Sequence, residues 1–172
     1  LCQHQLGNVA KAPNLLLEAC TYAPDDKRAI ALKALAYILQ EDCDKALEYG
    51  YEKIREYPDN ENLAGFILQA ARIKYHNEDT FVDPFDQFSE RLQLNQAVRI
   101  AHIHLLASRR VEGWRAMAQE FLEEYPDDAQ AKNLIAIGIL HHYVDNRQTA
   151  NGFTFTQDEV VELKLAAGYI SS

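Results

Sequence analysis

Apolar residues along most of this chain recur at intervals of three and four, the spacing that places them on one face of an α-helix. The two clearest runs are Ile30, Leu32, Leu35, Ile38 and Leu39, followed by Ala46, Leu47, Tyr51 and Ile54. Strand-like alternation is confined to the short stretch FTFT at residues 153–156. The pattern predicts an all-α fold built from short amphipathic helices.

Proline interrupts this pattern at a regular interval. Pro24 and Pro58 are 34 residues apart, and Pro126 follows Pro58 by twice that distance. The missing position holds Leu92, and another amphipathic segment follows it. Because proline cannot continue a helix and the Asp or Asn that follows it is a good N-cap, each proline motif ends one helix and starts the next. The spacing predicts helix pairs that repeat every 34 residues.

A 34-residue unit of helix, turn, second helix and closing proline resembles the tetratricopeptide repeat (TPR) family. In one such unit Ala34, Tyr37, Ala46 and Pro58 match the family's small, aromatic, alanine and proline positions. The resemblance implies a right-handed α-solenoid of antiparallel helix pairs, a TPR-like superhelix. We expect a single domain over residues 1–172, with a partial repeat at 1–26, repeats at 27–60, 61–94 and 95–128, and a degenerate last repeat with a capping helix at 129–172.

Two places depart from the repeat before its last unit. Trp114 and Phe121 replace small residues of the family pattern, so this repeat is degenerate. Pro84 falls where helix interior is expected, and we predict Asp83 as an N-cap with Pro84 as the first residue of a short helix.

This reading leaves an extended loop at about residues 76–82, which carries Phe81. Loops on rigid scaffolds often carry function, so Phe81 is a candidate partner contact. The alternative is that Phe81, Phe85 and Phe88 fill core space.

The C-terminal segment is predicted to leave the repeat after about His142, with a turn at Asn151-Gly152. Thr156 and Glu159 form a capping box that predicts a final helix at about 157–168. Its broad apolar surface comprises Val160, Leu163, Leu165 and Ala167. In a solenoid such a helix covers the last exposed core face.

Composition narrows the classes of partner. The chain has 17 Lys and Arg against 26 Asp and Glu, a formal net charge of −9, so neither nucleic acid nor an anionic membrane surface is an expected partner. The uncharged stretch at 134–144 is about half of the ~20 residues that a membrane-spanning helix needs. Cys2, Cys20 and Cys43 lack CxxC spacing, which indicates reduced thiols and a cytoplasmic location. The start at Leu1 indicates a segment of a longer protein.

No catalytic or cofactor motif stands out. The chain lacks a phosphate loop, a dinucleotide fingerprint, HExxH and GxSxG. His102 and His104 point to nearly opposite sides of a helix, and a zinc site that joined one of them to His141 or His142 would still need further ligands. We therefore predict a non-catalytic protein without a metal or cofactor.

The resemblance implies that the first helix of each repeat lines a concave groove. The apolar and other groove positions that it implies include Arg28, Ala31, Ile38, Leu39, Ile73, Ile103, Ile137 and Leu140. Amides and arginines gather at the groove positions of the middle and later repeats, where amides can bind a peptide backbone and arginines can bind carboxylates. The candidate partner-binding residues are Asn62, Gln69, Arg72, Gln96, Arg99 and Asn133, with Phe81 as a loop contact.

The predicted function is a protein–protein interaction module that binds a peptide or partner protein in this groove. The alternative is a structural or regulatory segment of a larger enzyme or of a secretion or assembly complex. Such a segment would serve intramolecular docking, or self-association through its terminal helices.

Overall fold

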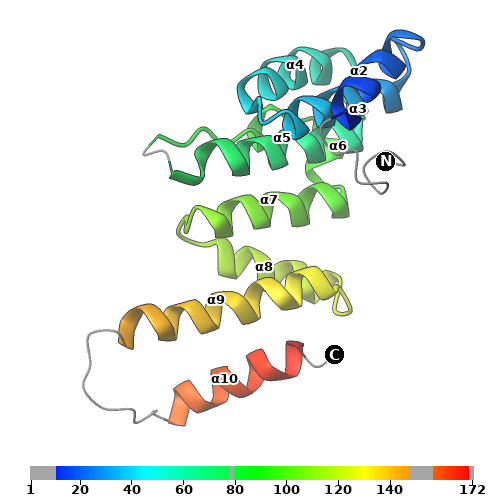
Figure 1. Cartoon of the computed structure of the whole chain (residues 1–172). Helices are drawn as coiled ribbons and strands as arrows, with labels where there is room; N and C mark the ends of the chain where they lie inside the picture. The colour runs from blue at the N-terminus through cyan, green and yellow to red at the C-terminus, as the bar shows by residue number, and fades with distance from the viewer. Residues whose placement is uncertain (1–10, 78–79, 148–156, 171–172) are drawn as a thin grey trace. The chain divides into compact units, whose positions relative to one another are not determined.

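The computed structural model describes residues 11–77, 80–147 and 157–170 (Figure 1). The predicted all-α fold is confirmed, because these residues form nine α-helices and two short 3-10 helices and contain no strand. The elements are α2 (Ala12–Thr21), α3 (Lys27–Leu39), α4 (Cys43–Glu56), α5 (Glu61–Lys74), η1 (Tyr75–Asn77), η2 (Phe85–Gln87), α6 (Glu90–Gln93), α7 (Gln96–Ser108), α8 (Trp114–Glu124), α9 (Ala129–Arg147) and α10 (Gln157–Ile170). The chain divides into two compact units, Leu1–Leu105 and Leu106–Ser172, with the division inside α7.

Aspartate and asparagine side chains cap α3, α5, α7 and α9. Asp26, Asn60, Asn95 and Asp128 each accept backbone N–H groups of the following turn at 2.8–3.1 Å. These bonds satisfy donors that a helix start leaves unpaired. The four caps are 34, 35 and 33 positions apart along the sequence. The predicted caps after Pro24, Pro58 and Pro126 are confirmed, and Asn95 continues the interval without a proline.

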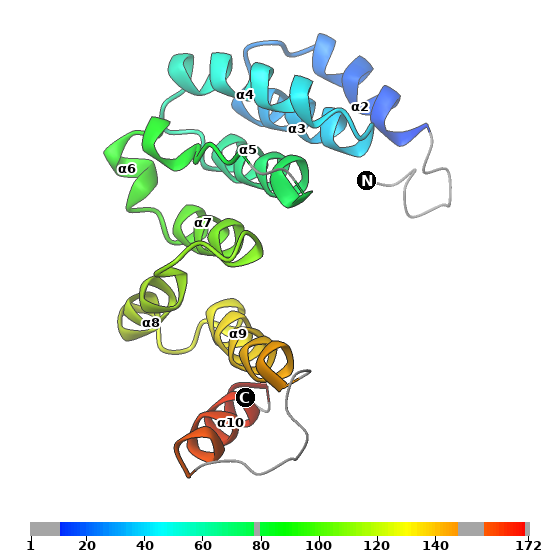
Figure 2. The same ribbon diagram turned by 90° about the vertical axis from the view of Figure 1, so that its left-hand side faces the viewer.

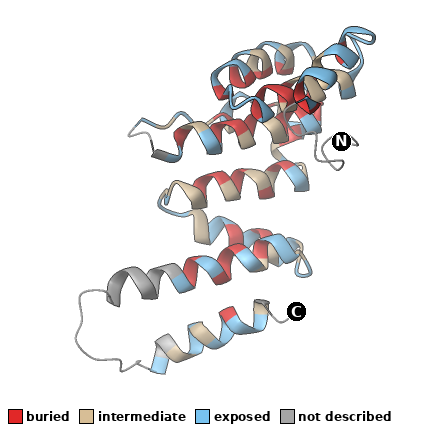
Figure 3. Cartoon of the chain, viewed as in Figure 1, coloured by how far each residue is buried: buried red, intermediate tan, exposed pale blue. Residues whose placement is uncertain are grey.

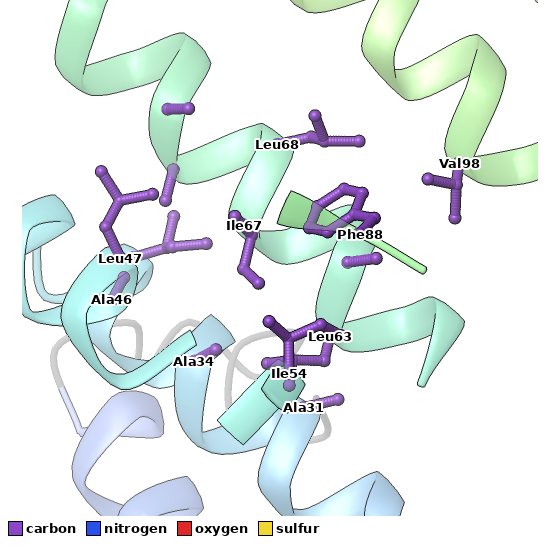
Figure 4. Close-up of a cluster of buried hydrophobic side chains, with 14 of the residues drawn as sticks. Ala31, Ala34, Ala46, Leu47, Ile54, Leu63, Ile67, Leu68, Phe88 and Val98 are labelled. Carbon is purple, nitrogen blue, oxygen red and sulfur yellow. The ribbon is translucent and has the colours of Figure 1, made fainter. Parts of the chain in front are cut away.

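In the first unit the helices pack around one core. α3 packs against α2, α4 and α5, and α4 packs against α5. α5 and the start of α7 lie side by side in both views (Figures 1 and 2). Leu63, Ile67 and Leu68 of α5 are almost completely buried, and Phe88 and Val98 join them from the chain on the far side of the loop (Figure 4). Burial of these apolar side chains is the main stabilising contribution to the unit.

A glycine brings α4 close to α5. A Cβ atom on Gly50 would lie 2.6 Å from Cγ1 of Ile67, well inside van der Waals contact. Gly65, on α5, has no atom within 4 Å of the equivalent position. Close packing therefore requires glycine at position 50 but not at position 65.

The segment between α5 and α7 differs from the prediction. Pro84 does not start an α-helix: a single 3-10 turn spans Phe85–Gln87, and the α-helix begins only at Glu90–Gln93, where Ser89 is the N-cap. Asp83 still accepts the Phe85 N–H at 3.0 Å. The helix starts late because the residue after the 3-10 turn takes up an extended backbone conformation, which interrupts the helical hydrogen bonds.

In the second unit α8 packs against α9, and α9 packs against α10. Phe121 of α8 is fully buried. The ring of Trp114 covers Gly138 of α9 so closely that a Cβ atom there would lie 2.2 Å from Cη2. Arg115 donates a hydrogen bond to the Gly138 carbonyl oxygen. Trp114, one of the two large residues of the degenerate repeat, is thus matched by a glycine on the facing helix.

The last two helices differ from the prediction in length and burial. α9 continues past His142 to Arg147. α10 starts at the predicted Gln157 and runs to Ile170. Among its described side chains only Ala166 is buried, whereas Leu165 is 44% exposed. The predicted apolar surface is therefore covered only in part, because Val160 and Leu163 are half-buried whereas Leu165 and Ala167 are exposed. The predicted turn at 151–152 and the capping residue Thr156 lie outside the described residues.

Candidate partner-binding site

Three of the predicted partner-binding residues share the outward face of α5. The ribbon of α5 alternates between buried and exposed stretches (Figure 3). Because the buried residues of α5, such as Leu63 and Ile67, turn toward the core, the helical period turns positions 62, 69 and 72 away from it. Asn62 and Arg72 are exposed and Gln69 is half-buried, while the neighbouring Ile73 is 46% exposed. Among the described residues no carboxylate lies within 4 Å of Arg72. We define Asn62, Gln69, Arg72 and Ile73 as the α5 face.

Gln96 and Arg99 lie in the first turns of α7, beside α5 in the same unit. Gln96 is exposed and Arg99 is half-buried, and both already interact with other groups of the chain. The next predicted groove position, Ile103, is 3% exposed. The exposed part of α7 on this side is therefore limited to its first turns.

The corresponding positions of α3 are divided between core and surface. Ala31 and Ile38 are 2% and 7% exposed, whereas Arg28 and Leu39 at the two ends of the helix are exposed. In the first unit the α5 face is the most open part of the predicted groove.

Asn133 belongs to the second unit. It is exposed on α9, and Ile137 and Leu140 continue the same side of the helix at 49% and 38% exposure. Spacings of four and three residues place these three side chains in one stripe. That Asn133 shares a groove with the α5 face stays a prediction.

Phe81 is half-buried against the core of the first unit. Its ring meets Tyr75 edge-on, with centroids 5.8 Å apart. Phe88, 5% exposed, is part of the core itself. That Phe81 contacts a partner stays a prediction.

A hydrogen-bonded pair that the sequence reading missed ties this loop segment to α7. His102, 5% exposed, bonds Asp83 at 2.7 Å through Nε2, and the Phe85 ring stacks on the imidazole at 3.9 Å between centroids. Burial alone would raise the pKa of Asp83, but the hydrogen bonds from His102 and the Phe85 N–H hold it below its ordinary value. The signal in the sequence was a histidine where the family pattern has a small residue, beside an enlarged loop.

A buried tyrosine hydroxyl lies in the same region. The hydroxyl of Tyr51 has no hydrogen-bond partner among the described residues. Burial, and then the proximity of Tyr75 and Asp83, raise the pKa of Tyr51 to about 12, so the phenol is neutral at physiological pH. An unpaired buried hydroxyl destabilises the fold.

The thiols and histidines of the described residues form no metal centre. No group of three or more His, Cys, Asp or Glu side chains in this part of the chain could hold a metal ion. Cys20 and Cys43 are buried free thiols whose pKa values are raised by burial, and Cys20 donates to the Ala29 carbonyl at 3.1 Å. The side chains of His141 and His142, and Cys2, lie outside what the structure describes.

Within the described ranges, no helix combines the length and the apolar character needed to cross a membrane.

No protein-family model matches the chain, and no curated protein or solved structure matches it either. The resemblance to TPR proteins therefore depends on the sequence positions named above and on the interval between the helix caps.

Proposed function

We propose that the chain is a TPR-like α-solenoid that acts as a non-catalytic protein–protein interaction module. The regular interval between the caps of α3, α5, α7 and α9 supports this proposal, as does the packing of α3 against both α4 and α5. Stacked helix pairs form a concave binding surface, and in the TPR family that the chain resembles the first helix of each pair lines it.

The α5 face is the observation that carries the proposal. It combines two amides, an arginine without a carboxylate partner among the described residues and an exposed isoleucine. Amides can bind the polar groups of a peptide backbone, a guanidinium can bind a carboxylate through two bonds, and Ile73 can contact an apolar side chain. The face contains no Asp or Glu although the whole chain carries a net charge of −9. We therefore propose a peptide segment with at least one carboxylate as its partner.

A second candidate function is a structural or regulatory segment that associates with another copy of itself or with its parent chain. The observation in its favour is apolar exposure in the second unit. Val161 and Leu165 of α10 are 62% and 44% exposed, one helical turn apart.

The test is selection of binding peptides from a random displayed library with the wild-type protein. The affinity of the selected peptides is then measured for the wild type, Arg72→Glu and Arg55→Glu. Arg72→Glu should lower the affinity for the selected peptides about tenfold or more, because it removes a charge-assisted hydrogen bond and repels the carboxylate of the peptide. Arg55→Glu makes the same charge change at an exposed position of α4 outside the α5 face, and should leave affinity within about twofold, since isolated surface charges contribute little.

Equal losses in the two variants, with unchanged circular dichroism, would exclude the α5 face as the binding site. If the library yields no binder and sedimentation shows a dimer that Leu165→Glu dissociates, self-association replaces peptide binding as the function.

A further inference from the structure

A pocket of about 440 Å³ opens between α2, α3 and α4 of the first unit. This volume lies in the range of small-molecule sites. None of the candidate partner-binding residues lines the pocket. Its lining combines apolar side chains, among them Leu17 and Ile30, with the ring of Tyr49 and the charged groups of Lys33, Lys53 and Asp25.

The two lysines of the pocket differ in their partners. Lys53 pairs with Glu52 at 3.2 Å and with Glu56 at 2.9 Å, so its charge is already compensated. The ammonium of Lys33 lies 4.9 Å from the centroid of the Tyr49 ring, and no carboxylate among the described residues lies within 4 Å of it. A cation–π contact does not neutralise the ammonium, because the aromatic ring attracts it through a quadrupole and carries no net charge. Lys33 is therefore the basic group of this pocket that can bind an anion.

Tyr49 places a second donor beside this cation. Its hydroxyl makes no hydrogen bond to the described residues, and burial raises the pKa of Tyr49 to about 12, which keeps the phenol protonated. The other small polar groups of the lining are already engaged: the Thr21 hydroxyl donates to the Glu18 carbonyl at 2.6 Å, and the Cys20 thiol donates to Ala29. The lining thus offers one ammonium and one phenolic hydroxyl as donors.

We propose that this pocket binds a small organic monocarboxylate, with the carboxylate at the Lys33 ammonium and the Tyr49 hydroxyl and the apolar body against Leu17 and Ile30. Two donors suit the two oxygens of one carboxylate. Asp25 adds a negative charge to the lining, which disfavours a second carboxylate on the ligand. This inference is independent of the proposed peptide binding, because the two sites share no residue.

The test is titration of the whole chain with hexanoate, hexanamide and adipate, followed by ¹H–¹⁵N correlation NMR. Hexanoate should bind saturably with a dissociation constant of about a millimolar, the strength expected for a ligand of this size. The shift changes should concentrate in α2, α3 and α4. Hexanamide, which lacks the charge, and adipate, which adds one, should each bind about fivefold more weakly or worse.

Two variants and one control locate the carboxylate. Lys33→Gln should weaken hexanoate about fivefold or more, and Tyr49→Phe should weaken it about two- to fivefold, because each removes one donor. Lys45→Gln is the matched control. Like Lys33, Lys45 lies over a tyrosine ring, with its ammonium 5.1 Å from the centroid of Tyr37, but it is exposed and outside the pocket lining, so its loss should leave binding unchanged.

The proposal is overturned by any of three results. The first is a hexanoate titration that does not saturate or that shifts residues throughout the chain. The second is equal binding of hexanamide. The third is a folded Lys33→Gln protein that binds hexanoate as the wild type does.

Discussion

Replacing Gly50 with alanine should destabilise the first unit, whereas the same replacement at Gly65 should stabilise it. Both glycines lie within helices, so both changes gain the helix propensity of alanine, about 0.5–1 kcal/mol. The two sites differ in the free space that surrounds the added methyl group. At Gly50 the new methyl group would lie 2.6 Å from Cγ1 and 3.1 Å from Cδ1 of Ile67, and at Gly65 no atom lies within 4 Å.

The cost at Gly50 follows from the rigidity of its neighbour. Ile67 is fully buried, and a β-branched side chain in a helix has one strongly preferred χ1 rotamer, so it cannot turn away. Overpacking of this kind typically costs about 1–3 kcal/mol. After the gain in helix propensity, Gly50→Ala should lower the free energy of unfolding by about 1–2 kcal/mol. The gain in helix propensity is common to both variants, so it cancels in the difference between their free energies of unfolding. This difference should be about 1–3 kcal/mol.

The assay is urea unfolding followed by circular dichroism at 222 nm, with the midpoint compared at an unchanged slope. A double-mutant cycle adds Ile67→Ala, which removes the clashing atoms. In that background Gly50→Ala should become neutral or stabilising. If Gly50→Ala raises the midpoint as much as Gly65→Ala does, α4 and α5 do not approach as closely as described, and the reasoning is refuted.

Three further predictions concern other contacts. Ionised Asp83 should stabilise the fold at neutral pH and lose this contribution as pH falls below 3.8, because its folded-state pKa lies below that ordinary value. In Asp83→Asn the urea midpoint should therefore fall less between pH 5 and pH 3 than in the wild type. An equally steep fall in the variant would contradict the role of the bond between Asp83 and His102. Tyr51→Phe should raise the free energy of unfolding by about 1 kcal/mol by removing an unpaired buried hydroxyl, and a loss of stability in urea would show that the hydroxyl has a partner. Gly138→Ala should destabilise the second unit by about 1–3 kcal/mol because the new methyl group meets the Trp114 ring, and an unchanged thermal midpoint would count against that contact.

The elements that depend on local sequence were predictable. Asp26, Asn60 and Asp128 cap their helices because a short polar side chain after a proline motif satisfies N–H groups two or three residues ahead. The core positions of α4, such as Ala46 and Ile54, follow equally from the helical period.

Contacts between distant segments were not predictable. His102 and Asp83 are 19 residues apart, and their bond depends on how the loop segment folds back onto α7. The late start of α6 was missed for a local reason, because the residue after the 3-10 turn at Phe85–Gln87 is extended and Ser89, not Asp83, caps the helix. Ile103 was placed on a groove and is buried, because periodicity defines a helix face but not which element covers it.

The contact between Trp114 and Gly138 also gives the chain an optical label of its own. Trp114 is the single tryptophan in the sequence, and its indole packs against Gly138 of α9. The Arg115 guanidinium lies 5.7 Å from the centroid of the indole ring. Its emission therefore reports on the second unit alone, whereas far-ultraviolet dichroism reports on the helices of both units. Unfolding curves recorded by the two signals would coincide if the units unfold cooperatively and separate if they unfold independently. The wild-type protein can thus reveal the energetic coupling between its halves without an attached dye.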